Sequence, residues 1–452
     1  MKRFQTINPY TLQVINDYEI DPVPLIQHKI KLAGNASRYW GNVKIWEREE
    51  ILKKLGSLLR QNKTIIAALI TEEMGKPITE SLAEVEKCAL TCEYYGNNLT
   101  KFLDQQEVHT EYLKSYIAYQ PLGVILGIMP WNFPLWQVIR FAVPTIAAGN
   151  VVLLKHAPNV LGCSKNLENI FLDAGFPEGV FQNLVVDTEV IKDILSDSQI
   201  KGVSLTGSER AGKSVAALAG SNIKKSVLEL GGNDPFIVLK DADLDKAASV
   251  ALQSRMQNGG QVCISAKRWI VEESVKEAFT EKIMKQVHHW KPEDPMLMTS
   301  KMGPLARLDL AENIEAQYKE AIKQGAVSLT EFSRENCMVQ PMILDNVSHE
   351  SVVIREETFG PLAAIVSAKT EEYAIALAND SRFGLGATIF TEDKDKGEKF
   401  ALKINAGIVF VNELVKSDPR FPVGGTGNSG YGRELGRMGV HEFVNAKTVI
   451  VN

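Results

Sequence analysis

Two stretches of the chain alternate between short apolar runs and helix-like segments, and this alternation constrains the fold more than any other feature. In the first stretch the runs VVLLK (151–155), VFQNLVV (180–186) and KGVSLTG (201–207) are interspersed with segments such as NLENIFLDAG (166–175). Apolar strands joined by crossover helices are typical of a parallel sheet that is covered on both faces. The sequence therefore predicts an α/β fold.

A second alternating stretch begins at PFIVL (235–239). We expect helices at 245–257 and 274–289, followed by strands at PLAAIV, ATIF and GIVFVN. The region 45–102 has apolar residues at helical intervals and predicts long helices. The tail HEFVNAKTVIVN is expected to be a terminal strand that pairs with another subunit, because an exposed strand usually needs a partner. At 452 residues the chain is long enough for two or three domains.

Charge and composition exclude several classes of partner. The net charge of -5 leaves no basic excess to neutralise phosphates, so we expect no nucleic acid partner. No run reaches the length of a membrane span, and the N-terminal residues lack the apolar core of a signal peptide. The five cysteines form no CxxC pair and no metal-ligand spacing, which indicates reduced thiols, a cytoplasmic location and no metal site.

A cysteine that follows two glycines is the first candidate for chemistry. Gly259 and Gly260 precede Gln261-Val262-Cys263, and a glycine-flanked turn lets substrate and backbone donors approach a thiol closely. Most free cysteines are small buried hydrophobic residues, and Cys263 taken alone favours that structural role. Cys263 is thus a candidate nucleophile whose role depends on its neighbours.

Two more polar residues are candidates to act beside a nucleophile. Glu229 ends the strand-like run SVLEL, and partial burial there would raise its pKa and make it a general base. Asn132 lies between an aromatic residue and a proline in MPWNFP, where a fixed amide suits an oxyanion hole. The simpler alternatives are a salt-bridged or solvated glutamate and an asparagine that caps a turn.

The segment 207–214, GSERAGKS, satisfies the P-loop pattern GxxxxGK[ST], follows a strand-like run and opens a helix. Taken alone, it predicts ATP or GTP binding. However, FIVLKD (236–241) is only a weak candidate for the acidic strand that such proteins need. In both nucleotide hydrolases and dinucleotide-binding proteins, a helix N-terminus of this kind binds phosphate. The segment therefore suits a dinucleotide pyrophosphate equally well.

Seven segments together resemble, in order, the signature series of the aldehyde dehydrogenase superfamily. They are MPWNFP, VVLLKHAP, SLTGSERAG, LELGG, GGQVC, REETFGP and FPVGGTGNSGYGRE, spread from about residue 129 to 434. KHAPN (155–159) and WQVIR (136–140) are most similar to the bacterial succinate-semialdehyde dehydrogenase branch. Because this superfamily binds dinucleotide phosphate at the P-loop-like segment, a nucleotide hydrolase becomes a remote alternative, and a catalytically silent relative is a third.

The resemblance implies NAD- or NADP-dependent oxidation of an aldehyde through a thioester on Cys263. It implies Glu229 as the general base, and Asn132 with the backbone N–H of Cys263 as the oxyanion hole. NAD-specific members often carry a glutamate where this chain has Pro158, so both cofactors are expected to be used. The residues implied to contact the cofactor are Trp131, Lys155, Gly207, Ser208, Gly212, Leu230, Glu357 and Phe359.

The architecture of the superfamily also implies a domain layout. It places a Rossmann-like cofactor domain at 1–110 and 124–229, a catalytic α/β domain at 230–420, and a small β oligomerisation arm at 111–123 and 435–452. We expect a homodimer or a homotetramer.

The expected substrate is a short aldehyde with a carboxylate at its far end, above all succinate semialdehyde. Arg140 follows Asn132 by eight residues, about two helical turns, in an otherwise apolar segment where an unpaired charge is costly. We expect Arg140 and Ser417 to bind the substrate carboxylate. The alternatives are an ion pair between Arg140 and a protein acid, and an enzyme for other short aliphatic aldehydes.

Overall fold

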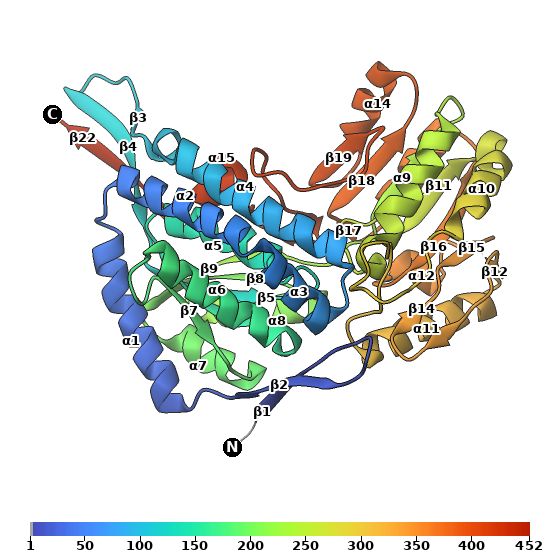
Figure 1. Ribbon diagram of the computed structural model, residues 1–452. Coiled ribbons are helices and arrows are strands. Elements are labelled where there is room, and N and C mark those ends of the chain that lie inside the picture. Colours follow the sequence, from blue (N-terminus) through green and yellow to red (C-terminus); the bar gives the residue numbers. More distant parts are fainter. Residues whose placement is uncertain (1–2) are drawn as a thin grey trace.

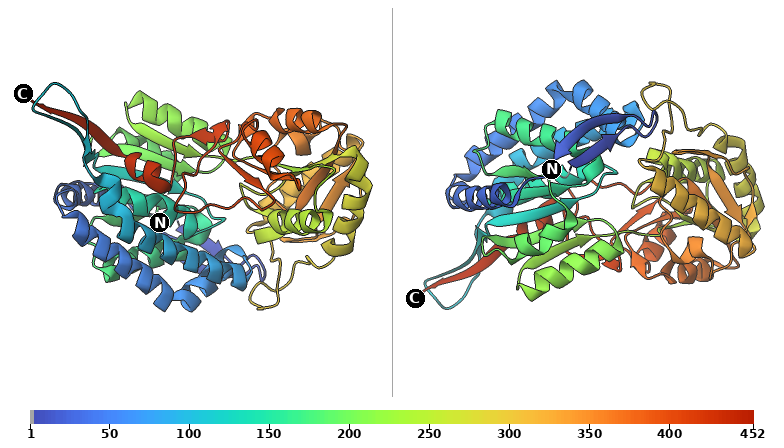
Figure 2. Two further views of the ribbon diagram at one scale, coloured as in Figure 1. Left: turned by 90° about the horizontal axis from the view of Figure 1, so that it is seen from above. Right: turned by 90° about the horizontal axis from the view of Figure 1, so that it is seen from below.

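The computed structural model describes residues 3–452. Two α/β units lie side by side, and a narrow antiparallel arm projects from the first of them (Figure 1). The views from above and below show that chain segments near residue 230 and near residue 420 run between the two units (Figure 2). The α/β fold predicted from the alternating segments is confirmed.

The first unit is built on a six-stranded sheet in the order β21-β9-β8-β5-β6-β7. All neighbouring strands are parallel except β21, which is antiparallel to β9. Every residue of β6 is buried, as expected for a strand covered on both faces. The strands are β5 (Val124–Met129), β6 (Val151–His156), β7 (Phe181–Leu184), β8 (Ile200–Thr206), β9 (Lys225–Glu229) and β21 (Gly430–Tyr431).

Helices cover both faces of this sheet, and the predicted helical region 45–102 forms three of them. The longest, α4, buries residues spaced three and four apart, which is the pattern of an amphipathic helix on a core. The helices are α1 (Val23–Trp40), α2 (Ile45–Gln61), α3 (Lys63–Met74), α4 (Ile78–Leu103), α5 (Trp136–Ala147), α6 (Leu161–Ala174), α7 (Ile191–Ser196), α8 (Glu209–Ser221) and α15 (Gly436–His441), with short turns η1 (Pro158–Val160) and η2 (Thr188–Val190) and an N-terminal hairpin of β1 (Arg3–Ile7) and β2 (Val14–Glu19).

The second unit has a seven-stranded sheet in the order β12-β15-β16-β11-β10-β18-β19. Only β12 is antiparallel to its neighbour. The strands are β10 (Pro235–Val238), β11 (Arg268–Glu272), β12 (Val327–Ser328), β15 (Met342–Asp345), β16 (Leu362–Ala368), β18 (Gly386–Phe390) and β19 (Ile408–Val411). Around it lie α9 (Leu244–Met256), η3 (Gln257–Gly260), α10 (Glu273–Val287), α11 (Leu308–Lys323), α12 (Val352–Arg355), α13 (Glu371–Asn379) and α14 (Lys394–Ala401), with the strand pairs β13 (Arg334–Glu335) with β14 (Met338–Val339) and β17 (Phe383–Gly384) with β20 (Thr426–Gly427).

The arm consists of three antiparallel strands, β22 (Val444–Val451), β4 (Lys114–Pro121) and β3 (Gln106–Glu107). The predicted terminal strand is present, and along one edge it pairs with β4 of its own chain; pairing with another subunit stays a prediction. Two segments more than 300 residues apart in the sequence therefore pair as antiparallel strands. The other edge of β22 has no strand beside it within residues 3–452.

The order of the first sheet fixes where a ligand can bind. On one side of β5 lie β6 and then β7. On its other side lie β8 and then β9. Loops that leave β5 and β8 therefore diverge and open a crevice at the carboxyl ends of these strands. Trp131 and Asn132 follow β5, Gly207 and Ser208 follow β8, and Glu229 is the last residue of β9. No helix within residues 3–452 is long and apolar enough to cross a membrane.

Candidate active site

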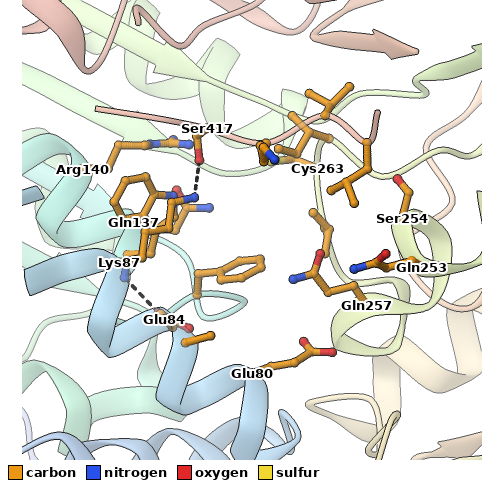
Figure 3. Close-up of a pocket in the computed structure, with 18 of the residues that line it drawn as sticks. Glu80, Glu84, Lys87, Gln137, Arg140, Gln253, Ser254, Gln257, Cys263 and Ser417 are labelled. Carbon is orange, nitrogen blue, oxygen red and sulfur yellow. Dashed lines mark hydrogen bonds between the residues drawn. The ribbon is translucent and has the colours of Figure 1, made fainter. Parts of the chain in front are cut away.

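Two cavities share Cys263 as a wall residue. Cavity A, of about 560 Å³, is lined by side chains of α4, α5 and the loops around residues 263 and 415, including Glu84, Lys87, Trp136, Arg140, Cys263 and Ser417 (Figure 3). Cavity B, of about 370 Å³, lies at the carboxyl ends of β5, β8 and β9, and it includes Trp131, Ser208, Glu229, Cys263, Glu357 and Phe359. A thiol between two cavities can meet a different molecule from each side.

The turn before Cys263 depends on its two glycines. Asn258, Gly259 and Gly260 all have positive φ, at 51°, 62° and 77°, a region that glycine adopts without steric cost. A Cβ on Gly260 would also collide with the backbone at Gly360. Local strain and close backbone approach together explain why this sequence carries a glycine pair ahead of the cysteine.

Positive groups surround Cys263. The Lys267 Nζ donates to the Cys263 carbonyl oxygen at 2.6 Å. Burial raises the pKa of the Cys263 thiol to about 11, although Arg140 and Lys267 favour its thiolate. The Cys263 backbone N–H has no hydrogen-bond acceptor within the described residues. A free donor beside the sulfur is one half of an oxyanion hole.

Asn132 supplies a second donor close to that turn. Its Nδ2 donates to the Gln261 carbonyl at 3.0 Å, and its own carbonyl accepts from Asn258 Nδ2 at 2.8 Å. The side chain is buried, with 3% of its surface exposed, and it lines cavity B. The first contact holds the side-chain amide and the second, which is to the backbone carbonyl of Asn132, fixes the main chain beneath it. The second N–H of Nδ2 stays available to an oxyanion near Cys263.

Glu229 lies at the end of β9, and among the described residues only one of its two carboxylate oxygens has a polar partner. Burial raises its pKa to about 8, although Arg140 opposes the shift. Oε2 lies 3.7 Å from Arg140 Nη2, and Oε1 has no hydrogen-bond partner in the part of the chain that is described. An acid in a cavity wall, with a near-neutral pKa and a buried oxygen that has no hydrogen-bond partner, has the properties of a general base.

Arg140 is buried on α5 and has a protein carboxylate as its partner. Its Nε donates to Glu434, its Nη2 donates to Thr206 Oγ1 at 3.3 Å, and Ser204 Oγ donates to the other Glu434 oxygen at 3.1 Å. We expected a substrate carboxylate in this place. The tertiary structure instead provides the alternative, an ion pair with an acid 294 residues away in the sequence.

Four residues that line cavity B offer contacts suited to a dinucleotide. Ser208 caps α8, and its Oγ accepts from Ala211 N–H, which leaves the helix N-terminus facing cavity B. Trp131 and Phe359 meet edge to face, with ring centroids 5.8 Å apart. Glu357 and Lys267 form an ion pair at 3.6 Å, and Glu357 Oε1 also accepts from Gly232 N–H at 3.2 Å.

The other predicted cofactor residues occupy different surroundings. Gly207 and Leu230 line cavity B, whereas Lys155 and Gly212 are not among the wall residues of either cavity. Gly212 lies against Leu230, because a Cβ on it would lie 2.6 Å from Leu230 Cδ1. Lys155 lies in β6, where burial lowers its pKa and Asp187 opposes that shift.

Lys213, the lysine of the P-loop pattern, does not point toward a phosphate site. The Lys213 side chain is 71% exposed and pairs with Glu209 one turn earlier on α8. It therefore points to solvent rather than to a phosphate beside the turn at 207–208. The helix N-terminus remains as an anion site, which is the part of the pattern that a dinucleotide shares.

Sequence reasoning gave no role to three residues that the structure places at the site. Glu434 lies inside the quoted GYGRE segment, but nothing local indicated its partner. Lys267 lies four residues after Cys263, and this spacing is the only signal that could have suggested it. Lys87 faces cavity A from α4, and its Nζ donates to Ser417 Oγ at 2.7 Å, a contact across 330 residues. Ser417 was predicted to line the substrate site and does line cavity A.

Comparison with known proteins agrees with this geometry. The model of the aldehyde dehydrogenase family matches residues 1–449. The chain is 46% identical to a probable succinate-semialdehyde dehydrogenase [NADP(+)] of Synechocystis, over 98% of both chains. It is 44% identical to the succinate semialdehyde dehydrogenase [NAD(P)+] Sad of Escherichia coli, over 98% of this chain and 97% of the other. A solved succinic semialdehyde dehydrogenase of Streptococcus pyogenes, in complex with NADP+, has a TM-score of 0.97 and 35% identity over 99% of both chains.

Proposed function

This chain belongs to the aldehyde dehydrogenase family, and we propose that it oxidises succinate semialdehyde to the corresponding dicarboxylate with NADP+ or NAD+. The observation that carries the proposal is the position of Cys263 in the wall common to two cavities. One cavity can admit the aldehyde and the other the cofactor. The relatives named for this substrate, at 44–46% identity over nearly the whole chain, support the choice of aldehyde.

Cavity B has the donor set that a dinucleotide requires. The α8 N-terminus with Ser208 suits a pyrophosphate, Glu357 can accept from ribose hydroxyls, and Trp131 and Phe359 offer flat apolar faces for a nicotinamide ring. When bound there, an oxidised nicotinamide would take up the hydride that the substrate loses. The remaining chemistry belongs to the side chains around Cys263.

Acylation starts when the Cys263 thiol gives its proton to water; the thiolate sulfur then bonds to the aldehyde carbon, and the carbonyl π bond breaks onto oxygen. The carbonyl oxygen then carries a negative charge, which Asn132 Nδ2 and the backbone N–H of Cys263 stabilise. Each such donor typically contributes a few kcal/mol to the transition state. Loss of a hydride from that carbon restores the carbonyl and leaves a thioester.

Deacylation relies on Glu229. Its ionised carboxylate removes a proton from water, the oxygen bonds to the thioester carbon, and the carbon–sulfur bond breaks to release the acid. The unpartnered Oε1 and the near-neutral pKa of Glu229 support this role. A carboxylate with an ordinary pKa would be a weaker base at the same position.

The test combines turnover with trapping of the intermediate. Purified protein is assayed with NAD+ or NADP+ on succinate semialdehyde and on butanal, and separately with ATP and Mg2+. We expect dinucleotide reduction, higher kcat/KM for succinate semialdehyde, and no ATP hydrolysis. Equal kcat/KM for butanal would favour a general short-chain aldehyde dehydrogenase, and ATP turnover without dinucleotide reduction would overturn the proposal.

Variants then separate the two half-reactions. Cys263→Ala should abolish oxidation, whereas Glu229→Gln should complete one turnover and accumulate an acyl-enzyme visible as a mass increase on Cys263. A Glu229→Gln enzyme with a normal steady-state rate and no adduct would remove Glu229 from the base role.

The same proposal includes the roles of the larger units. The unit around the six-stranded sheet, predicted at 1–110 and 124–229, is assigned to cofactor binding, the unit around the seven-stranded sheet, predicted at 230–420, to catalysis, and the arm, predicted at 111–123 and 435–452, to subunit contact. Two segments depart from these bounds, because β3 pairs within the arm and α15 packs with the first unit. The open edge of β22 and its mostly exposed side chains support pairing of two arms in a homodimer or homotetramer. A cytoplasmic location remains a prediction.

A further inference from the structure

Lys87 is a cation in the wall of cavity A for which the catalytic scheme has no use. It projects from α4 toward the cavity, where its Nζ donates to Ser417 Oγ at 2.7 Å (Figure 3). The same ammonium lies 4.0 Å from the centroid of the Trp136 ring. These contacts fix the position of the charge but do not neutralise it.

The acids nearest to Lys87 are occupied by other partners. Glu84, one turn earlier on α4, accepts from the backbone N–H groups of Leu135 and Trp136 at 2.9 Å each and pairs with Lys76. Asp418 accepts from the Arg420 guanidinium through both oxygens. Across residues 3–452, no carboxylate oxygen lies within 4.0 Å of Lys87 Nζ.

The other two cations of cavity A both have a carboxylate within 4.0 Å: the exposed Lys416 lies 3.9 Å from Glu413, and the buried Arg140 is paired more closely. Arg140 has Glu434 as a direct partner and Glu229 at 3.7 Å, so two carboxylates offset its single charge. Lys87 is half-buried, and a partly desolvated cation without a counter-ion is destabilised, so an anion that enters the cavity would remove part of that cost. The uncompensated positive charge of cavity A is therefore on Lys87 rather than on Arg140.

We propose that Lys87, with Ser417 beside it, binds the carboxylate at the far end of the substrate and is the residue that makes this enzyme prefer aldehydes bearing a distal anion. The inference rests on the proposed function, because it assumes that the aldehyde enters cavity A toward Cys263. An ammonium and a hydroxyl together give a carboxylate two charge-assisted donors. Lys87 is a specificity residue in this scheme and takes no part in bond making.

The decisive quantity is the ratio of kcat/KM for succinate semialdehyde to kcat/KM for butanal. Lys87→Met keeps the length of the side chain but removes the charge, and we expect the ratio to fall by about ten- to a hundredfold, the range typical for loss of a charged hydrogen bond. Lys87→Arg restores a cation and should recover most of the ratio. Lys101→Met, an exposed lysine near the end of the same helix, is the matched control and should leave the ratio at the wild-type value.

The wild-type enzyme supplies a second measurement that needs no variant. Burial lowers the pKa of Lys87 to about 8, with Arg140 adding to the shift. The ammonium is present below that pKa and lost above it, so the same ratio should fall as pH rises from 7 to 9.5. Titration of Cys263 or Glu229 changes kcat/KM for both aldehydes by the same factor, so it cancels in the ratio.

One other group in the wall of cavity A also titrates near this range: burial raises the pKa of Glu80 to about 7, so it is mostly ionised above about pH 8 and the fall in the ratio above that pH reports on Lys87. Burial raises the pKa of Cys88 well above its usual value, and Arg420 lowers that of Asp418. Although burial opposes it, Glu434 and Glu229 raise the pKa of Arg140. Both oxygens of Glu84 accept hydrogen bonds from groups other than Lys87.

The outcomes separate this inference from the function on which it rests. A wild-type enzyme that does not prefer succinate semialdehyde would overturn the proposed function. A wild-type enzyme that prefers it, with the ratio unchanged in Lys87→Met and flat between pH 7 and 9.5, would overturn the role of Lys87 and leave the function standing. A ratio that collapses in Lys87→Met and returns in Lys87→Arg would establish the role.

Discussion

Arg140 Nη2 lies 3.7 Å from Glu229 Oε2, so the candidate general base faces a buried guanidinium whose nearest partner is a second acid, Glu434. The cation favours the ionised form of Glu229, whereas burial disfavours it, and the net result is a pKa of about 8. Arg140 thus acts on the chemistry through a carboxylate of the protein.

Replacement of Arg140 by methionine should affect all substrates. Removing one partner of a buried ion pair leaves Glu434 and Glu229 uncompensated, and this should lower the free energy of unfolding by about 3–5 kcal/mol. It should also reduce kcat/KM for succinate semialdehyde and butanal to a similar extent. Denaturant unfolding and the two rate measurements check this, with Arg140→Lys as a milder variant. A loss confined to succinate semialdehyde would instead make Arg140 the carboxylate anchor.

The rate of deacylation should depend on pH through Glu229. The base is the ionised form, which exists above the pKa of about 8, so the rate should rise with pH and level off above 8. Below 8 it should fall by about tenfold per pH unit. Decay of the acyl-enzyme followed after rapid mixing measures this step separately from acylation. In Glu229→Gln the residual decay should lose this profile; an unchanged profile would assign it to another group.

Both dinucleotides should support activity. Lys155 is a cation at the end of β6, and Pro158 supplies no carboxylate to repel a 2′-phosphate. Lys155→Met should therefore reduce kcat/KM for NADP+ more than for NAD+. The exposed Lys213 provides the control, since Lys213→Met should leave the NADP+ to NAD+ ratio as in the wild type. Undetectable wild-type activity with NADP+ would show that another residue excludes the phosphate.

Gly231 should be essential for the position of Glu357. A Cβ at Gly231 would collide with the Glu357 carboxylate, so Gly231→Ala should displace Glu357 and raise KM for the dinucleotide by about tenfold or more, the cost of losing a charged hydrogen bond. Gly220→Ala on α8 is the matched control, because no atom lies within 4 Å of its added methyl. Equal dinucleotide KM values in the two variants would argue against a role for Glu357 in cofactor binding.

The sequence predicted the sheets well because burial of a strand on both faces is visible in the strand itself. VVLLK and PFIVL became β6 and β10, and the region 45–102 became α2, α3 and α4. Of the polar residues at such strand ends, Glu229 was found because it ends a strand-like run, Asn132 from its place in MPWNFP, and Ser208 from the family resemblance. Asn132, Ser208 and Glu229 directly follow or end strands β5, β8 and β9, and parallel strands bring such ends to one edge.

The partners of charged residues could not be predicted in this way. An apolar segment indicated that Arg140 needs an anion, but Glu434, which provides it, lies 294 residues later. Likewise, the tail was predicted to be a strand that needs a partner, but nothing local indicated that β4, more than 300 residues earlier, pairs with one of its edges. Periodicity and propensity are properties of neighbouring residues, so the sequence by itself determined the α/β architecture and the edge of the sheet where the site lies. Which charges meet depends on how distant segments pack, and only the tertiary structure decided that Arg140 is neutralised while Lys87 keeps a free charge.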